Sequence, residues 1–328
     1  PPALPDMIHL DRSSAPLSFA QERMWFLDQL NPGLIAYNMP TSLKIKGDLN
    51  LDYLKKSVEK IVQNHEVLRT SFQIVNGTAM QIVQPFESSM QNKNIFRVVQ
   101  KSENEDDVRT AIENQIKEPF YLDSTALFYV QVFTLSKSEY ILFVHMHHII
   151  SDGWSMDIFF DELIGNYTKF KLGQSLPTEI NKITYLDYAV WQRNLFETNS
   201  DFLQKNISYW KKTLAHASPS IDLPTDSVRG KTRGFGGSEI RFHLNNSLSK
   251  RVFQFCSQRE TTPFILFFSA FTLLLSKYSR QKDIIIGTPV AGRTQNETEK
   301  LMGLFVNTVP LRVVLNETGN VTDLLEQV

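Results

Sequence analysis

Apolar residues recur at two spacings along the chain, and the spacing predicts which segments are helices and which are strands. In 51–62 and in 159–167 they return every three or four positions, which is typical of amphipathic helices. On either side of an Asn-Gly pair at 76–77, two runs alternate between apolar and polar residues. Because Asn-Gly favours positive φ, these runs predict a hairpin with a two-residue turn. Two further runs, 126–135 and 139–148, predict a pair of long strands.

The second half of the chain uses the same mixture of elements. Thr262 as N-cap and Pro263 at the first helical position predict that a helix starts there. Other helices are predicted at 185–196, 202–214 and 247–260, and strands at 238–244, 283–293 and 305–315. A polar stretch at 174–182 separates the halves. We therefore predict an α+β fold of two similar lobes, 14–176 and 177–328, after a linker at 1–13.

Composition and charge argue against several classes of protein. The 328 residues are 42% hydrophobic and carry a net charge of −1, so no overall basic field favours nucleic acid or a membrane surface. The longest apolar run, Phe264 to Leu275, is too short to span a bilayer and predicts a buried helix. Cys256 is the single cysteine, so we expect no intrachain disulfide and a cytoplasmic protein. The opening "PPALPDM" and closing "VTDLLEQV" lead us to expect a piece of something longer.

Three histidines lie within four positions in "HMHHIISDGWS", His145 to Ser155, and a metal site is the first interpretation to test. The pattern H-x-H-x-D-H would need Asp at 149 and His at 150, and both positions are Ile. The helical pattern H-E-x-x-H is also absent. We therefore expect a site without metal.

Two interpretations of the cluster remain open from the residues alone. In the structural one, side chains alternate along a strand, so His147 and His148 are ordinary groups on opposite faces, and Asp152 is an N-cap with Gly153 in the turn. In the functional one, a histidine at a strand end takes a proton near pH 7, and the carboxylate four residues later fixes the loop. No G-x-S-x-G elbow is present. The functional interpretation therefore indicates a base or orienting group between two bound substrates.

Five segments, in order, carry a resemblance to a known family. "MHHIISDGWS" (146–155) resembles the H-H-x-x-x-D-G signature of condensation domains from nonribosomal peptide synthetases, which epimerization domains and chloramphenicol acetyltransferase-like acyltransferases share. "LSFAQERMWFL" (17–27) resembles the family's first motif, and "NHEVLRTSF" (64–72) its second, with Asn64 where Arg is usual. "YLDYAVW" and "GLFVNTVPLR" resemble the fourth and fifth motifs, at 185–191 and 303–312.

The resemblance implies a fold and a reaction. The fold would be two acetyltransferase-like lobes in a V with the site in a tunnel between them, and the second lobe incomplete at its C-terminus. The α-amine of an acceptor aminoacyl thioester would attack an upstream donor thioester to form a peptide bond in secondary metabolite biosynthesis. Both substrates would be carried on phosphopantetheine by donor and acceptor carrier proteins, next to an adenylation domain. The domain itself would need no cofactor.

The same resemblance implies roles for individual residues. His148 would receive or orient a proton of the amine, and His147 would support the pocket. Asp152 would hold the loop through an ion pair with Arg293 or Arg69.

Other residues would touch the substrates. Gly153 would let the backbone approach the thioester, and Asn307 would bind substrate, with Ser151 and Trp154 as second choices. The Gly-rich loop at 233–237 lacks a phosphate-binding pattern and is interpreted as a connection.

Three functions other than condensation are compatible with the same signature: an epimerization domain, a free-standing acyltransferase of the same superfamily, and a non-catalytic docking module. The first and fifth motifs favour condensation over epimerization. Cyclization domains usually carry Asp where this chain has His147, and docking relatives have usually lost the histidine pair. The sequence therefore favours peptide-bond formation.

Overall fold

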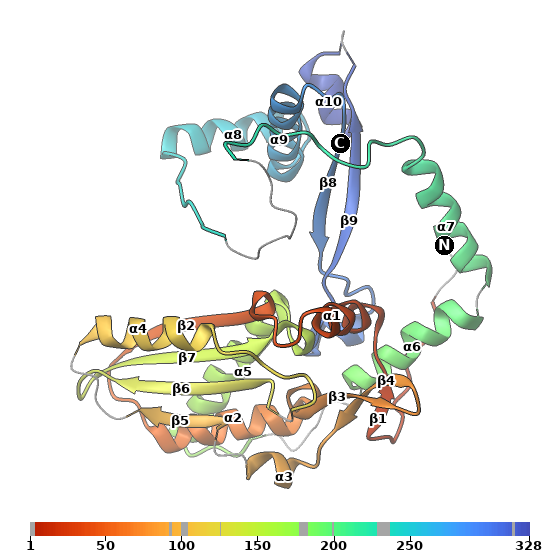
Figure 1. Ribbon diagram of the computed structural model, residues 1–328. Helices are drawn as coiled ribbons and strands as arrows, with labels where there is room; N and C mark the ends of the chain where they lie inside the picture. The colour runs from red at the N-terminus through yellow and green to blue at the C-terminus, as the bar shows by residue number, and fades with distance from the viewer. Residues whose placement is uncertain are drawn as a thin grey trace. The chain divides into compact units, whose positions relative to one another are not determined.

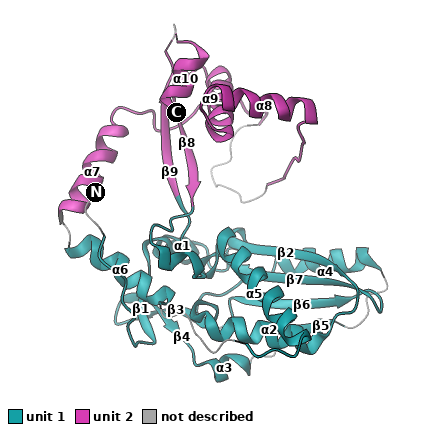
Figure 2. Cartoon of the chain, turned by 180° about the vertical axis from the view of Figure 1, so that it is seen from behind, with its two compact units in different colours: residues 1–200, 291–307 teal, residues 201–290, 308–328 magenta. Residues whose placement is uncertain are grey.

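The computed structural model describes residues 4–91, 94–99, 104–124, 126–176, 183–198, 200–227, 237–316 and 319–328. The chain divides into two compact units, coloured separately in Figure 2. The first contains residues 1–200 together with 291–307, and the second contains 201–290 and 308–328. This division differs from the predicted boundary at 176/177, part of which lies outside the described residues, as do 233–236 of the Gly-rich loop.

A four-stranded sheet, in the order β2-β7-β6-β5, forms the centre of the first unit. Its strands are β2 (Asn38–Lys46), β7 (Glu139–His147), β6 (Phe128–Thr134) and β5 (Phe96–Val99). In this sheet β5 and β6 are parallel, and the other neighbouring pairs are antiparallel. The two long strands predicted on either side of 136–138 are thereby confirmed as an antiparallel pair.

Helices cover both faces of this sheet (Figure 1). On one face, α2 (Leu51–Asn64) and α5 (Gly153–Lys171) pack together and bury Val58 and Phe159 with Val144 of β7. On the other face, α4 (Glu105–Ile116) buries Val108 against Phe143. Adjacent residues of β7 thus enter different cores, because side chains alternate across a strand. The arrangement confirms the α+β class.

A smaller sheet, in the order β1-β4-β3, completes the first unit. Its strands are β1 (Ser14–Pro16), β3 (Thr70–Val75) and β4 (Thr78–Val83). Asn76 and Gly77 link β3 to β4 with φ of 51° and 79°, so the predicted Asn-Gly hairpin is confirmed. The remaining helices of this unit are α1 (Phe19–Leu30), α3 (Phe86–Met90) and α6 (Tyr185–Thr198), with 3₁₀ turns η1 (Ile35–Tyr37), η2 (Glu66–Arg69), η3 (His148–Ile150) and η4 (Asn296–Lys300).

Helix α6 explains why the first unit extends beyond residue 176. Its first residues are buried, and Leu186 packs against Ala15 and Val83 of the small sheet. The predicted linker is also held here: Asp187 accepts hydrogen bonds from Leu10 N at 2.9 Å and from the His9 ring at 3.0 Å. Part of residues 1–13 therefore packs on α6.

The second unit contains α7 (Ser200–Thr213), α8 (Asn246–Gln258), α9 (Pro263–Ser279), α10 (Val321–Gln327) and the strands β8 (Asp283–Val290) and β9 (Asn307–Val314). Phe268 of α9, Val313 and Leu324 form a buried cluster, and Arg312 pairs with Asp283 at 2.8 Å. Thr262 caps α9 through Ile265 N, as predicted. The strand predicted at 238–244 is wrong, because these residues are exposed and pair with no strand among the described residues.

The exposure of α9 corrects a second expectation. Phe264, Phe267 and Phe271 are each about half exposed (52%, 49% and 48%), so the helix predicted to be buried is buried on one side only. Within the described ranges, no single helix has the length and hydropathy to cross a membrane. Only α8 and α9 taken together pass that test, and they are bent by 105° at the break between them.

A buried ion pair holds residues 291–307 against the rest of the first unit. Arg293 Nη2 lies 3.2 Å from Asp152 Oδ1, and the two side chains are 2% and 3% exposed. The same guanidinium donates to the carbonyls of Thr298 and Leu301. Arg293 therefore joins the start of α5 to a segment more than a hundred residues later in the chain.

Arg293→Ala should lower the free energy of unfolding by about 3–5 kcal/mol, because it leaves the Asp152 charge buried without its partner. The matched control is Arg109→Ala, which removes an exposed pair with Asp106 and should cost about 1 kcal/mol or less. Urea denaturation of both variants measures the difference. Equal losses would contradict the importance given to the buried pair.

The attachment of the N-terminal residues should depend on pH. The hydrogen bond with Asp187 raises the pKa of His9 above its ordinary value near 6.5. A raised folded-state pKa stabilises the fold fully below the unfolded pKa, and this contribution is lost as pH rises through the folded pKa. The difference in melting temperature between wild type and His9→Ala should therefore be largest below about pH 6.5 and shrink as the pH rises above it. A difference that grows with pH would contradict this.

Candidate functional site

The site predicted from the histidine cluster lies where β7 ends and α5 begins. Ile149 and Ile150 of the intervening turn η3 are fully buried in the main core, which also contains Met24 of α1. The burial of these two side chains fixes the turn between β7 and α5. Of the three histidines, His145 and His147 are 0% and 2% exposed, whereas His148 is only partly buried. Only His148 of the three is therefore accessible to a substrate.

One hydrogen bond fixes the tautomer of His148. Its Nδ1 lies 2.7 Å from the carbonyl oxygen of Ser151. A carbonyl only accepts, so Nδ1 carries the hydrogen in the neutral ring and Nε2 presents a lone pair. The imidazole is thus oriented to accept a proton or a hydrogen bond at Nε2.

His147 and His145 are uncharged supports of this turn. Burial lowers the pKa of His147 to about 3, helped by the neighbouring His148 and His145, and burial alone lowers the pKa of His145 to about 4. His147 Nδ1 accepts a hydrogen bond from Ile149 N at 3.1 Å, and His145 Nδ1 lies 2.9 Å from the Tyr129 hydroxyl. Neither ring carries a proton charge at neutral pH.

Asp152 caps α5 and connects it to residues 303–305. Its Oδ1 accepts from Ser155 N at 2.8 Å, and its Oδ2 accepts from Phe305 N at 3.0 Å. Ser155 Oγ in turn donates to Asp152 at 2.7 Å and accepts from Gly303 N at 3.0 Å. Arg293 is the ion-pair partner, as described above. The alternative partner Arg69 instead donates to Gln84 O and pairs with Glu66, so that alternative is wrong.

The positions next to Asp152 differ in how open they are. A Cβ built on Gly153 would meet no atom within 4 Å, so the space in front of this backbone is open. Trp154 is 47% exposed, and its indole nitrogen donates to Glu299 O at 3.0 Å. Ser151 is fully buried and acts through its carbonyl on His148. Gly153 is therefore the residue of this group best placed for close approach of a substrate.

Asn307 lies at the start of β9 and is exposed. Its side-chain oxygen accepts a hydrogen bond from Arg23 Nη1 of α1 at 3.2 Å. Sequence reasoning missed Arg23, and also Ser155 and Tyr185, which contact residues 303–305. All three lie inside recognised motifs, "LSFAQERMWFL", "MHHIISDGWS" and "YLDYAVW", which was the available signal.

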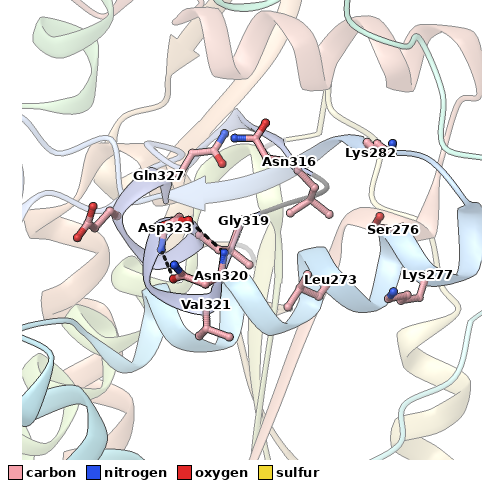
Figure 3. A pocket seen from close by; sticks show the side chains of 13 residues that line it. Leu273, Ser276, Lys277, Lys282, Asn316, Gly319, Asn320, Val321, Asp323 and Gln327 are labelled. Carbon is pink, nitrogen blue, oxygen red and sulfur yellow. Dashed lines mark hydrogen bonds between the residues drawn. The ribbon is translucent and has the colours of Figure 1, made fainter.

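Nothing in the described part of the chain gathers three or more His, Cys, Asp or Glu side chains into a possible metal site. A pocket of about 720 Å³ lies in the second unit, between α9, α10 and the residues after β9 (Figure 3). None of the predicted site residues lines it. The candidate site is the turn at His148 and the start of α5 in the first unit, and Asn307 is linked to it through the hydrogen bonds of residues 303–305.

Comparisons with known proteins agree with the motifs. The family model described as "Condensation domain" matches residues 11–328. Tyrocidine synthase 3 of Brevibacillus parabrevis is 34% identical over 297 residues, which cover 90% of this chain and 4% of that protein. Gramicidin S synthase 2 of Brevibacillus brevis is 34% identical over 313 residues, which cover 95% and 7%. The chain therefore spans only a small part of these curated relatives.

Solved structures show the same fold. The X-domain from teicoplanin biosynthesis, in its complex with OxyB, matches with a TM-score of 0.85 at 22% identity, covering 99% of this chain and 71% of that one. The first condensation domain of the CDA synthetase matches with a TM-score of 0.80 at 18% identity, covering 96% and 72%. With the family match across nearly the whole chain, these findings show that the chain belongs to the condensation domain family of nonribosomal peptide synthetases.

Proposed function

We propose that this chain forms a peptide bond between a donor acyl or peptidyl thioester and an acceptor aminoacyl thioester, both tethered to carrier proteins. One observation carries the proposal: the His148 ring, partly exposed, has Nδ1 held by Ser151 O and its Nε2 lone pair available. The carbonyl that holds the ring belongs to Ser151, two residues before α5 begins at Gly153. A proton acceptor and a helix N-terminus at one place suit the attack of an amine on a thioester.

The proposed reaction has two stages, addition of the amine and loss of the thiol. The acceptor amine attacks the thioester carbon, and its carbonyl oxygen becomes an oxyanion. His148 Nε2 accepts, or orients, a proton of the attacking nitrogen. The intermediate then collapses and the carbon–sulfur bond breaks. The leaving pantetheine sulfur takes that proton and departs as a thiol. The amide bond replaces the thioester, and the imidazole returns to its neutral form.

The helix N-terminus is suited to the developing oxyanion. The first amides of a helix have no partner within it, and the macrodipole favours negative charge there. Gly153 is the first residue of α5 and is exposed, and a Cβ built on it would lie in open space. Its amide is therefore the proposed donor to the thioester oxygen.

Asn307 is proposed to bind substrate through its side-chain amide. Arg23 donates to its oxygen at 3.2 Å, which holds the side chain at the start of β9. Ser151 and Asp152 hold the turn rather than touch substrate in this scheme, and Trp154 remains a second choice for contact.

The partners follow from the proposed reaction. They are an upstream donor and a downstream acceptor carrier protein, with an adenylation domain as neighbour, and the domain needs no cofactor of its own. The peptide synthases that match this chain support this setting. The V-shaped arrangement, the incomplete second lobe, the lobe boundary and the cytoplasmic location remain predictions.

A docking module is the second candidate function. The solved complex of the X-domain with OxyB shows this fold binding another protein. The retained His147 and His148, and the hydrogen bonds that both rings make to the turn after β7, favour condensation. An epimerization domain or a free-standing acyltransferase would use the same histidine but yield a different product.

His148→Ala should slow dipeptide formation by roughly 10²–10⁴-fold, the usual contribution of a positioned acid or base. The assay supplies loaded donor and acceptor carrier proteins to the protein that contains this chain, and mass spectrometry detects the dipeptidyl product. His243→Ala, an exposed histidine of the second unit, is the control and should leave the rate unchanged.

The other outcomes of this assay identify the alternatives. Product formation unaffected by His148→Ala would remove the catalytic assignment. Carrier binding without any product from wild type would indicate the docking function. A product with an inverted stereocentre and no new amide would indicate epimerization.

Gly153→Ala separates substrate contact from folding. The added methyl meets no protein atom, so melting temperature should not fall, yet dipeptide formation should drop because the methyl enters the space proposed for the thioester. Gly165→Ala, in the same helix and also without a neighbour within 4 Å, is the matched control. Equal rates for the two variants would rule out close approach of substrate at Gly153.

A further inference from the structure

The motif "YLDYAVW" has no role in the proposed chemistry, yet its first residue connects three separate parts of the site. Tyr185 begins α6 and is 2% exposed. Burial raises the pKa of its hydroxyl well above the ordinary value, so the group stays protonated. Its oxygen lies 2.5 Å from Leu304 O and 2.9 Å from Ser18 Oγ.

The direction of each hydrogen bond follows from the chemistry of the groups. Leu304 O only accepts, so the Tyr185 hydroxyl must donate to it. The Ser18 hydroxyl then donates to the Tyr185 oxygen, and Ser18 Oγ accepts from Gln21 N at 3.2 Å. Because Ser18 is the N-cap of α1, this chain of bonds runs from α1 through α6 to Leu304.

Three consecutive residues are thereby fixed by three different side chains. Gly303 N bonds to Ser155, Leu304 O to Tyr185, and Phe305 N to Asp152. The three bonds hold a backbone segment that ends two residues before Asn307.

Tyr185 also restricts which residue can occupy position 303. Gly303 has a φ of 153°, and a Cβ there would lie 2.0 Å from Cδ2 of the Tyr185 ring. The backbone of 303–305 therefore rests on this ring as well as on its hydroxyl. Any side chain at 303 would displace either the Tyr185 ring or the 303–305 backbone.

Both partners of the Arg23–Asn307 hydrogen bond depend on this connection. Arg23 is on α1, whose N-cap Ser18 is held by Tyr185, and Asn307 follows the segment that Tyr185 holds by Leu304. The hydrogen bonds of the Tyr185 hydroxyl go to Ser18 and Leu304. Its influence on Arg23 and Asn307 is therefore through the backbone.

We propose that Tyr185 is a positioning residue for peptide-bond formation, setting the place of Asn307 relative to α1 and to the start of α5. The inference rests on the proposed function, because it assigns Asn307 to the substrate. A displacement of about 1 Å far from the reacting atoms is enough to slow an enzyme by about a hundredfold. A single hydroxyl joining three elements is suited to prevent such a displacement.

The test is Tyr185→Phe, compared with Tyr188→Phe, in the dipeptide assay with loaded carrier proteins. Both tyrosines are buried in α6, and each variant loses one buried hydroxyl. The Tyr188 hydroxyl accepts a hydrogen bond from Gln192 of the same helix. We expect both variants to remain folded, with a ten- to hundredfold lower kcat/KM for Tyr185→Phe and no comparable loss for Tyr188→Phe.

A double-mutant cycle with Asn307→Ala supplies the readout that a purely structural role would not move. If Tyr185 acts through Asn307, the double variant should be about as slow as the slower single variant, whereas independent effects multiply. Equal rates for the two tyrosine variants, or multiplying effects in the cycle, would overturn the positioning role while wild type still forms dipeptide. Wild type that forms none would overturn the proposed function, and the positioning role with it.

Discussion

The buried Asp152–Arg293 pair is the interaction on which the described site depends. Each charge is almost fully removed from water, so neither is tolerated without the other. Burial lowers the pKa of Arg293, the expected result when the charged form loses solvent. The pair is not isolated, because Asp152 also caps α5 and holds Phe305 N while Arg293 holds two carbonyls of the same returning segment. One ion pair thus fixes the end of the histidine turn and the segment that leads to Asn307.

Features set by neighbouring residues could be predicted from the sequence. Asn76-Gly77 fixes a turn through its own φ preferences, and Thr262-Pro263 starts a helix through its own hydroxyl and ring. Asp152 as N-cap is equally local, since the capped amide lies three residues away. His148 differs from His147 in exposure because β7 ends at His147 and the turn begins at His148. These predictions needed no knowledge of distant parts of the chain.

Features set by residues far apart could not be derived in the same way. Asp152 pairs with Arg293 and not with Arg69 because residues 291–307 pack beside the start of α5. No local sequence pattern indicates that packing. The connection from Ser18 through Tyr185 to Leu304 joins residues more than a hundred positions apart. The run at 238–244 alternates like a strand, yet a strand exists only where a partner offers its hydrogen bonds. Periodicity indicates what a segment can form, and tertiary contacts decide whether it does.

The electrostatics around the turn indicate what kind of catalyst this site can be. Burial lowers the pKa of both His147 and His145 and keeps them neutral, so they contribute shape and hydrogen bonds and no charge. The His148 ring cannot rotate to offer its other nitrogen without losing the bond to Ser151 O. In the proposed reaction the main task would be to hold the two reactants and one proton acceptor in a fixed geometry. The hydrogen bonds on residues 303–305 and on the start of α5, together with the Asp152–Arg293 pair, are suited to provide that rigidity.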